Sequence, residues 1–82
     1  MEKEALARRF GELVRRLRSE RGYSQERFAE VCRIDRSYMG MIERGEVSVT
    51  LTVIAKLAGG LGLTLSALFL ELERTTEGQD EA

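Results

Sequence analysis

The sequence predicts an all-α domain of five helices, and three observations support this fold class. The 82 residues include no proline, and 33 % of them are charged, a composition typical of a compact and mostly helical domain. Apolar residues recur at intervals of three and four, which is the period of an amphipathic helix. Serine, aspartate or threonine precedes several of these apolar segments, where its side chain can cap the start of a helix.

The first predicted helix spans Glu2 to Arg21. Its apolar residues form a single stripe at helical period: Leu6, Phe10, Leu13, Val14 and Leu17. Glutamates lie near its start and arginines near its end, an arrangement that suits the helix dipole. Gly22 follows the last turn, where left-handed backbone is common. We therefore expect one face of this helix to be buried and the arginine-rich face to be solvated.

Two short helices joined by a tight turn are predicted next. Ser24 caps the first of them, which runs from Gln25 to about Val31. Asp35 caps the second, which runs from Arg36 to Arg44. The side chains expected to point inward from this pair are Phe28, Ala29, Cys32, Met39 and Ile42. Such a pair is a helix-turn-helix, a motif whose second helix lies in the major groove of DNA.

A loop from Gly45 to Val49 leads to the fourth predicted helix. Thr50 caps this helix, which runs from Leu51 to about Gly60. Its inner face is expected to carry Val53, Ile54, Leu57 and Ala58. Two adjacent glycines, Gly59 and Gly60, weaken its last turn by about 1 kcal/mol each relative to alanine.

The fifth predicted helix begins at the cap Thr64 and continues to about Arg74. It holds more apolar residues than one face of a short helix can bury, so some would stay in water in a monomer. A dimer interface, shared with part of the fourth helix, accounts for them and comprises Leu63, Leu65, Leu68, Phe69 and Leu72. Dimerisation also adds burial to a chain that is short for independent folding. The alternative is a helix packed wholly inside the core of one protomer.

The domain organisation follows from these elements. Residues 1–72 are predicted to form one helix-turn-helix domain for DNA binding and dimerisation, and residues 73–82 an acidic, disordered tail. The chain has no apolar run long enough to cross a membrane and no signal-peptide pattern at its start. Its single cysteine excludes an internal disulfide and fits a reducing cytoplasm.

Several segments resemble the helix-turn-helix of the phage repressor and Cro family. The most specific are Arg18, the GYSQ turn at Gly22 to Gln25, Ala29, and the segments DRSY and IERG. Within that family, the run IDRSYMGMIERGEVSVTL most resembles the small controller proteins of restriction-modification operons, and the resemblance covers Phe10 to Phe69. It implies a lambda-repressor-like fold and a regulator that switches from activating to repressing its own promoter.

The resemblance also implies a partly buried ion pair between Arg18 and Glu43, which would lock the first helix to the third. Two positions depart from the family pattern. Arg33 stands where the family usually has glycine, and a non-glycine residue in left-handed backbone costs about 1 kcal/mol. Val47 stands in a loop that often carries basic or amide side chains against DNA, which leaves Ser48 and backbone amides as candidates there.

Direct readout of a base is predicted for Arg36, because a guanidinium can bond both O6 and N7 of guanine. Gln25 opens the second helix, where backbone amides bind phosphate, and Ser24 can add to that contact. Further contacts to bases or phosphates are predicted for Ser37, Tyr38, Met41, Arg44 and Ser48. For each of these residues, the alternative is an ordinary exposed surface position.

The formal net charge of −1 conceals an asymmetry along the chain. Residues 1–44 hold eleven basic and eight acidic side chains, a net charge of +3. Residues 45–82 hold two basic and six acidic side chains, a net charge of −4. Since salt screens charges more than about 10 Å apart, a basic surface on the first half can bind DNA despite the acidic second half.

An enzyme is not expected from these residues. Histidine is absent, and there is neither a Ser–Lys or Cys–His constellation nor a phosphate-cradling glycine loop. Cys32 lacks the second cysteine or the histidine that a metal site would need, so a small buried side chain is its better interpretation. No metal, cofactor or small-molecule ligand is predicted.

The predicted function is sequence-specific regulation of transcription on double-stranded DNA. One recognition helix reads only about four base pairs, so a homodimer on a palindromic operator is expected. The controller protein of a restriction-modification system is the interpretation that the resemblance favours. A phage-type repressor, or an antitoxin that acts mainly by protein–protein contact through exposed leucines, is the alternative.

Overall fold

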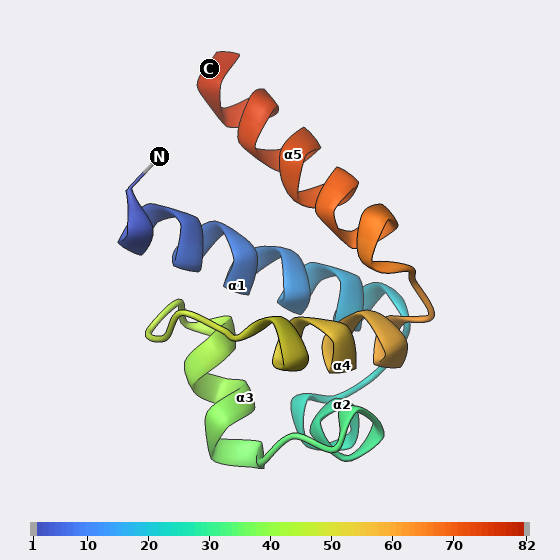
Figure 1. The fold of residues 1–82 in the computed structure, drawn as a ribbon. Helices are drawn as coiled ribbons and strands as arrows, with labels where there is room; N and C mark the ends of the chain where they lie inside the picture. The colour runs from blue at the N-terminus through green and yellow to red at the C-terminus, as the bar shows by residue number, and fades with distance from the viewer. Residues whose placement is uncertain (1, 82) are drawn as a thin grey trace.

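A computed structural model describes residues 2–81 of the chain, with side chains described for residues 2–75. Its five helices are α1 (Lys3–Glu20), α2 (Gln25–Cys32), α3 (Arg36–Glu43), α4 (Leu51–Leu61) and α5 (Leu65–Glu81). No strand occurs within residues 2–81. The predicted all-α fold of five helices is confirmed (Figure 1).

Helix α1 lies at the centre of the fold and contacts each of the other four helices. In Figure 1, α5 crosses above α1, whereas α3, α4 and α2 lie below it. Four members of its predicted apolar stripe are buried: Phe10, Leu13, Val14 and Leu17. The fifth, Leu6, is 43 % exposed and borders an open recess instead. The helical period therefore predicted the buried face correctly except at its first position.

Helices α1 and α3 approach each other closely at Gly11, which is buried in α1. A Cβ atom at this position would overlap the carbonyl oxygen of Ile42 and would lie 2.7 Å from that of Glu43. Only glycine allows the backbones of the two helices to come this near. The sequence pattern indicates no role for Gly11, although this contact sets the position of α3.

The predicted capping residues start four of the helices. Each accepts a hydrogen bond from a backbone N–H of the first turn, which otherwise has no partner within the helix. The caps are Ser24 for α2, Asp35 for α3, Thr50 for α4 and Thr64 for α5. At the other end of α4, Gly62 adopts left-handed backbone with a φ of 72° and terminates the helix.

The core holds side chains from all five helices, and it decides part of the predicted dimer interface. Leu68 is 0 % exposed within a single protomer, so its assignment to that interface is wrong. Leu68 belongs to the cluster of buried core residues, and α5 packs against α1 and α4. Leu63 and Leu72 are partly buried against the same core. Leu65 and Phe69 each remain 37 % exposed.

Helix α5 continues to Glu81, beyond the end at Arg74 that the sequence predicted. The predicted disordered tail begins at residue 73, within this helix, and the side chains of residues 76–82 lie outside the described residues. The division of the chain at that point stays a prediction. Among the described residues, no single helix is both long and apolar enough to cross a membrane; α4 and Leu65–Thr75 pass only as a pair, bent by 94°.

Candidate nucleic-acid interface

The turn between α2 and α3 is closed by a left-handed residue. Arg33 has a φ of 58° and a ψ of 46°. Its N–H donates to the carbonyl oxygen of Glu30 at 3.1 Å, and the N–H of Ile34 donates to that of Ala29 at 2.9 Å. These two bonds occupy carbonyls at the end of α2 and turn the chain sharply toward α3. Arg33 therefore adopts the conformation that the family's usual glycine would adopt.

Helix α2 is held in place by close packing against α4. A Cβ atom at Gly60 would overlap Sγ of Cys32 and would lie 3.2 Å from the ring of Phe28. Burial raises the pKa of the Cys32 thiol from 9.0 to about 11, so the thiol stays protonated at neutral pH. Cys32 acts here as a small apolar side chain. No cluster of metal-ligating residues occurs among the side chains that the structure describes.

A buried charge network connects α1, α2 and α3. Nε and Nη2 of Arg18 donate to the two carboxylate oxygens of Glu43 at 2.7 and 3.0 Å. Nη1 of Arg18 donates to the carbonyl oxygen of Tyr23 at 2.8 Å. Nε2 of Gln25 donates to Oε1 of Glu43 at 3.0 Å. The side chains of Arg18 and Glu43 are only 12 % and 4 % exposed, so this network fixes α3 to the rest of the domain.

The outer face of the motif forms a shallow depression on α2 and α3. It is lined by Gln25, Arg36, Ser37, Gly40, Met41 and Arg44. Five of the eight residues predicted to contact DNA therefore lie together. A Cβ atom at Gly40 would lie 3.0 Å from Nη1 of Arg44, so the missing side chain gives Arg44 room to lie over α3. The arrangement presents two guanidinium groups, a hydroxyl and an amide on one surface.

The other three predicted contact residues lie outside this depression. Ser24 is exposed at the cap of α2, next to Gln25. Tyr38 is partly buried and packs against the core. Ser48 is exposed in the loop between α3 and α4, where it borders a recess near the start of α1. The structure thus brings most of the predicted site together and places Ser48 apart from it.

Comparison with known proteins agrees with this geometry. The family model described as a helix-turn-helix domain matches residues 9–69, about three quarters of the chain. The chain belongs to that family. This assignment makes it a helix-turn-helix transcriptional regulator, and family members of this type bind double-stranded DNA.

Within the family, the chain is similar to controller proteins of restriction-modification systems. It is 43 % identical to the control protein C.MunI of a Mycoplasma species, over 80 % of this chain and 90 % of that protein. It is 40 % identical to C.BamHI of Bacillus amyloliquefaciens, over 88 % and 86 % of the two chains. The crystal structure of the restriction-modification controller protein C.AhdI from Aeromonas hydrophila superposes with a TM-score of 0.77 at 40 % identity, covering 83 % of this chain and 99 % of that one.

The two arginines that line the depression, Arg36 and Arg44, are paired with acidic side chains for which the sequence predicted no role. Nη2 of Arg36 lies 3.1 Å from Oε1 of Glu26. Nε and Nη2 of Arg44 donate to the two oxygens of Glu46 at 2.7 and 3.2 Å. The hydrogen bond with Arg44 lowers the pKa of the Glu46 carboxyl, and the same bond raises the pKa of the Arg44 guanidinium.

Sequence signals for these two pairs differ. Glu46 follows Arg44 by two positions, close enough for the pair to be considered from the sequence. Glu26 and Arg36 lie on different helices, so only the geometry of the turn brings them together.

Proposed function

We propose that this helix-turn-helix protein is a sequence-specific regulator that binds palindromic DNA operators as a homodimer and controls a restriction-modification operon. The observation that carries the proposal is the exposed depression on α2 and α3, with Arg36 at the first position of α3. The similarity to C.MunI and C.BamHI over 90 % and 86 % of their lengths supports the choice of a controller among the regulators of this family.

The proposed reading of DNA divides the site into two kinds of contact. Arg36 bonds O6 and N7 of a guanine, because it stands at the start of α3, which a helix-turn-helix presents to base edges. Ser37 and Met41 lie on the same face and complete the base contacts. The start of α2 binds phosphate through backbone N–H groups, with Ser24 beside them. The amide nitrogen of Gln25 is bonded to Glu43, so in this proposal its side chain positions α2 rather than donating to phosphate.

Phosphate contacts at the edges of the site complete the interface. Arg44 lies at the end of α3, and its side chain is 59 % exposed. Tyr38 is partly buried, and in this proposal its hydroxyl group donates to a phosphate. Ser48 lies apart from the depression, so it can contact DNA only if the phosphate backbone of the DNA passes over the loop between α3 and α4.

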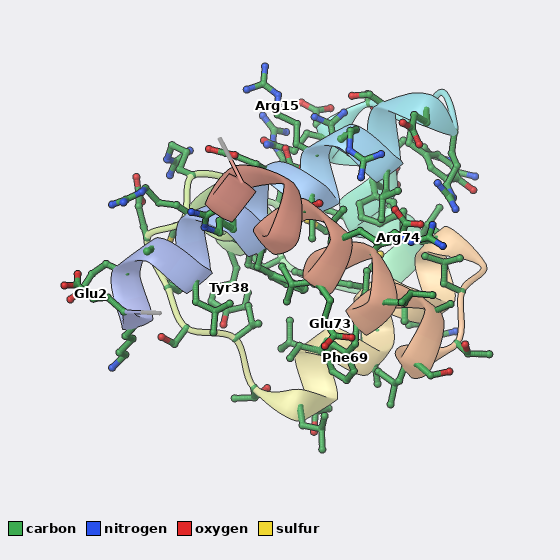
Figure 2. All side chains as sticks on the ribbon, turned by 90° about the horizontal axis from the view of Figure 1, so that it is seen from above. Glu2, Arg15, Tyr38, Phe69, Glu73 and Arg74 are labelled. Carbon is green, nitrogen blue, oxygen red and sulfur yellow. The ribbon has the colours of Figure 1, made fainter. Side chains whose placement is uncertain are left out.

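The exposed apolar side chains of α4 and α5 support dimerisation. Leu51, Leu65, Phe69 and Leu70 are 66, 37, 37 and 48 % exposed. In Figure 2, Phe69 and Glu73 lie on one side of α5 and Arg74 lies on the other. Such a group of exposed apolar residues is typical of a protein interface. We assign it to a second copy of the chain, with Leu65 and Phe69 as its principal members.

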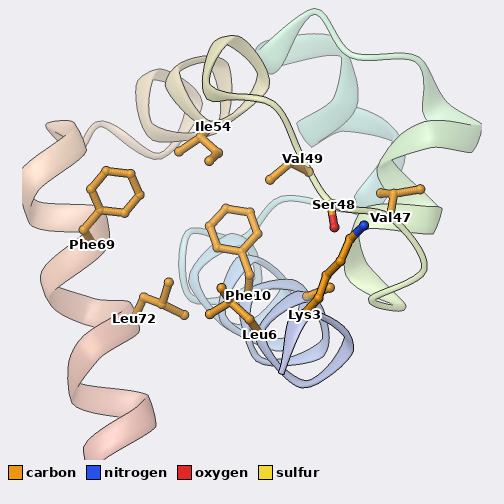
Figure 3. Close-up of a pocket in the computed structure, with 10 residues that line it drawn as sticks. Lys3, Leu6, Phe10, Val47, Ser48, Val49, Ile54, Phe69 and Leu72 are labelled. Atoms are coloured by element: carbon orange, nitrogen blue, oxygen red, sulfur yellow. The ribbon is translucent and has the colours of Figure 1, made fainter. Parts of the chain in front are cut away.

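An apolar recess adjoins this surface. It has a volume of about 410 Å³, and Figure 3 shows Phe69 and Leu72 of α5 facing Phe10 and Leu6 of α1 across it. Residues Val49 and Ile54 close its other side. The recess extends the exposed apolar surface from α5 to the start of α1. A side chain of the second protomer can therefore enter between the two helices.

The proposal is tested first on the wild-type protein and on Arg36→Ala. We expect gel-shift titrations to show selective binding to an inverted repeat upstream of the chain's own gene. Arg36→Ala should lose about 1–3 kcal/mol of discrimination at one guanine per half-site, because the bidentate contact is removed. Equal losses on all sequences would show that Arg36 contacts only phosphate. Sedimentation of the free protein should give a dimer.

A regulator that acts mainly by protein–protein contact, such as an antitoxin, is the second candidate. The exposed residues of α5 favour it, because they would serve a different protein as well as a second copy. The same sedimentation experiment separates the two functions. A monomer that binds an operator only after a second protein is added would support this candidate.

A further inference from the structure

The helix-turn-helix surface carries a carboxylate that its predicted DNA contacts do not explain. Oε1 of Glu26 lies 3.1 Å from Nη2 of Arg36, and the two side chains are 64 % and 72 % exposed. A carboxylate here repels the phosphates that this surface has to approach. An ion pair between exposed groups adds little to folding stability, so stability does not explain its position either.

We propose that Glu26 is a specificity-determining residue, which positions Arg36 for guanine and withholds it from phosphate. The proposal rests on the proposed function, because it requires Arg36 to read a base. A guanidinium presents five N–H donors on a planar fork. A single carboxylate oxygen beside Nη2 leaves the other edge of that fork available to O6 and N7 of guanine. Arg36 can thus keep Glu26 as its partner while it binds the correct base.

Binding to unrelated DNA has a different requirement. Without guanine at the right position, the guanidinium gains most by turning to the nearest backbone phosphate. In our proposal, that movement separates it from Glu26 and leaves the carboxylate facing the negatively charged backbone. The ion pair therefore disfavours the non-cognate complex and leaves the cognate complex unaffected. This difference is what makes Glu26 act on specificity rather than on affinity alone.

The charged groups around Glu26 support its assignment to Arg36. Glu30 lies one turn further along α2, and its Oε1 is 3.7 Å from Nη1 of Arg27. Arg33 borders the same part of the surface. Each of the two carboxylates on this side of α2 thus has its own arginine. Glu30 provides a matched control, because it is similarly exposed (69 %, against 64 % for Glu26) and also paired, but it does not touch a residue predicted to read a base.

Glu46 provides a second and different comparison. It holds Arg44 through both carboxylate oxygens, and Arg44 is proposed to contact phosphate. A phosphate is present in cognate and non-cognate complexes alike. Removing the charge of Glu46 should therefore strengthen both complexes by the same factor, without changing specificity.

The experiment compares Glu26→Gln, Glu46→Gln and Glu30→Gln with the wild type. The probes are a duplex of about 30 base pairs selected by the wild-type protein from a random pool, and a scrambled duplex of equal length. Dissociation constants are measured between about 50 and 200 mM salt. Glu26→Gln should bind the scrambled duplex about 3–10-fold more tightly, with a salt slope steeper by roughly 0.9, because one further phosphate is contacted. Its affinity for the selected duplex should stay unchanged or fall.

Each possible outcome has a distinct meaning. Specificity is the affinity for the selected duplex divided by the affinity for the scrambled duplex. A lower specificity for Glu26→Gln, with unchanged specificity for Glu46→Gln and Glu30→Gln, supports the proposal. Equal strengthening on both duplexes by Glu26→Gln would overturn it and leave only general repulsion. A loss confined to sites with cytosine at one position would also overturn it, because Glu26 would then accept a bond from the cytosine amine. If the wild type selects no sequence at all, it is the proposed function that fails.

Discussion

The exposed surfaces of the helix-turn-helix and of α5 differ in the kind of side chain that they present to solvent. The helix-turn-helix exposes charged side chains, and the structure pairs Arg36 and Arg44 with partners of its own. Helix α5 exposes Leu65, Phe69 and Leu70, which have no comparable partner in the protomer's core. The two arginines of the first surface thus already have ion-pair partners within one chain. The second gains its partner only from another molecule, in the dimer that we propose.

The largest expected effect concerns the network that fixes the helix-turn-helix to the domain. Glu43→Ala should lower the free energy of unfolding by about 3–5 kcal/mol, because it leaves the buried guanidinium of Arg18 without its counter-charge. Urea denaturation followed by circular dichroism measures this change. Glu20→Ala is the control, since Glu20 pairs with Arg16 at 3.1 Å but both side chains are about half exposed. Its effect should stay below about 1 kcal/mol, and equal effects would contradict the role of the buried network.

A second prediction separates two neighbouring residues of α5. Leu68→Ala should destabilise the protomer by about 2–5 kcal/mol, because it leaves a cavity in the core. Phe69→Ser should change the unfolding free energy of the protomer much less and should instead weaken dimerisation. Sedimentation equilibrium gives the dimer dissociation constant for each variant. A Phe69→Ser protein that dimerises as tightly as the wild type would remove α5 from the proposed interface.

The smallest expected effect compares two helical glycines. Gly11→Ala should cost about 1–3 kcal/mol, because its Cβ would meet the backbone of α3 and push the two helices apart. At Gly59, a Cβ atom would have no neighbour within 4 Å. Gly59→Ala should therefore stabilise the protein by up to about 1 kcal/mol. Thermal unfolding of the two variants should shift in opposite directions, and shifts of the same sign would show that the close approach at Gly11 can relax.

The sequence predicted the parts of the fold that depend on local chemistry. The starts of three helices could be predicted from their capping residues, because a short polar side chain accepts a hydrogen bond from a backbone N–H three residues further on. These caps are Ser24, Asp35 and Thr50. The Arg18–Glu43 pair followed from the family resemblance. The left-handed turn did not, because Arg33 stands where the family usually has glycine, and this departure left the geometry of the turn open.

The parts that the sequence did not predict depend on contacts between distant segments. Leu68 and Phe69 are both apolar and adjacent, and only the direction in which α5 faces the core makes one buried and the other exposed. Gly11 looks like a weak point in a helix until α3 is placed against it. Glu26 looks like a solvated side chain until the turn brings it next to Arg36.

The central position of α1 has a consequence for how the operator is built. One helix carries both α3, through Gly11 and Arg18, and the recess beside α5, through Leu6 and Phe10. In the proposed dimer, α1 therefore fixes the distance between the dimer interface and the DNA-binding surface of each protomer. A fixed distance of this kind requires a fixed spacing of the half-sites, which we expect to be one helical turn of DNA, about 34 Å. Inserting about five base pairs between them turns the second half-site to the far side of the duplex, where the same dimer cannot reach it.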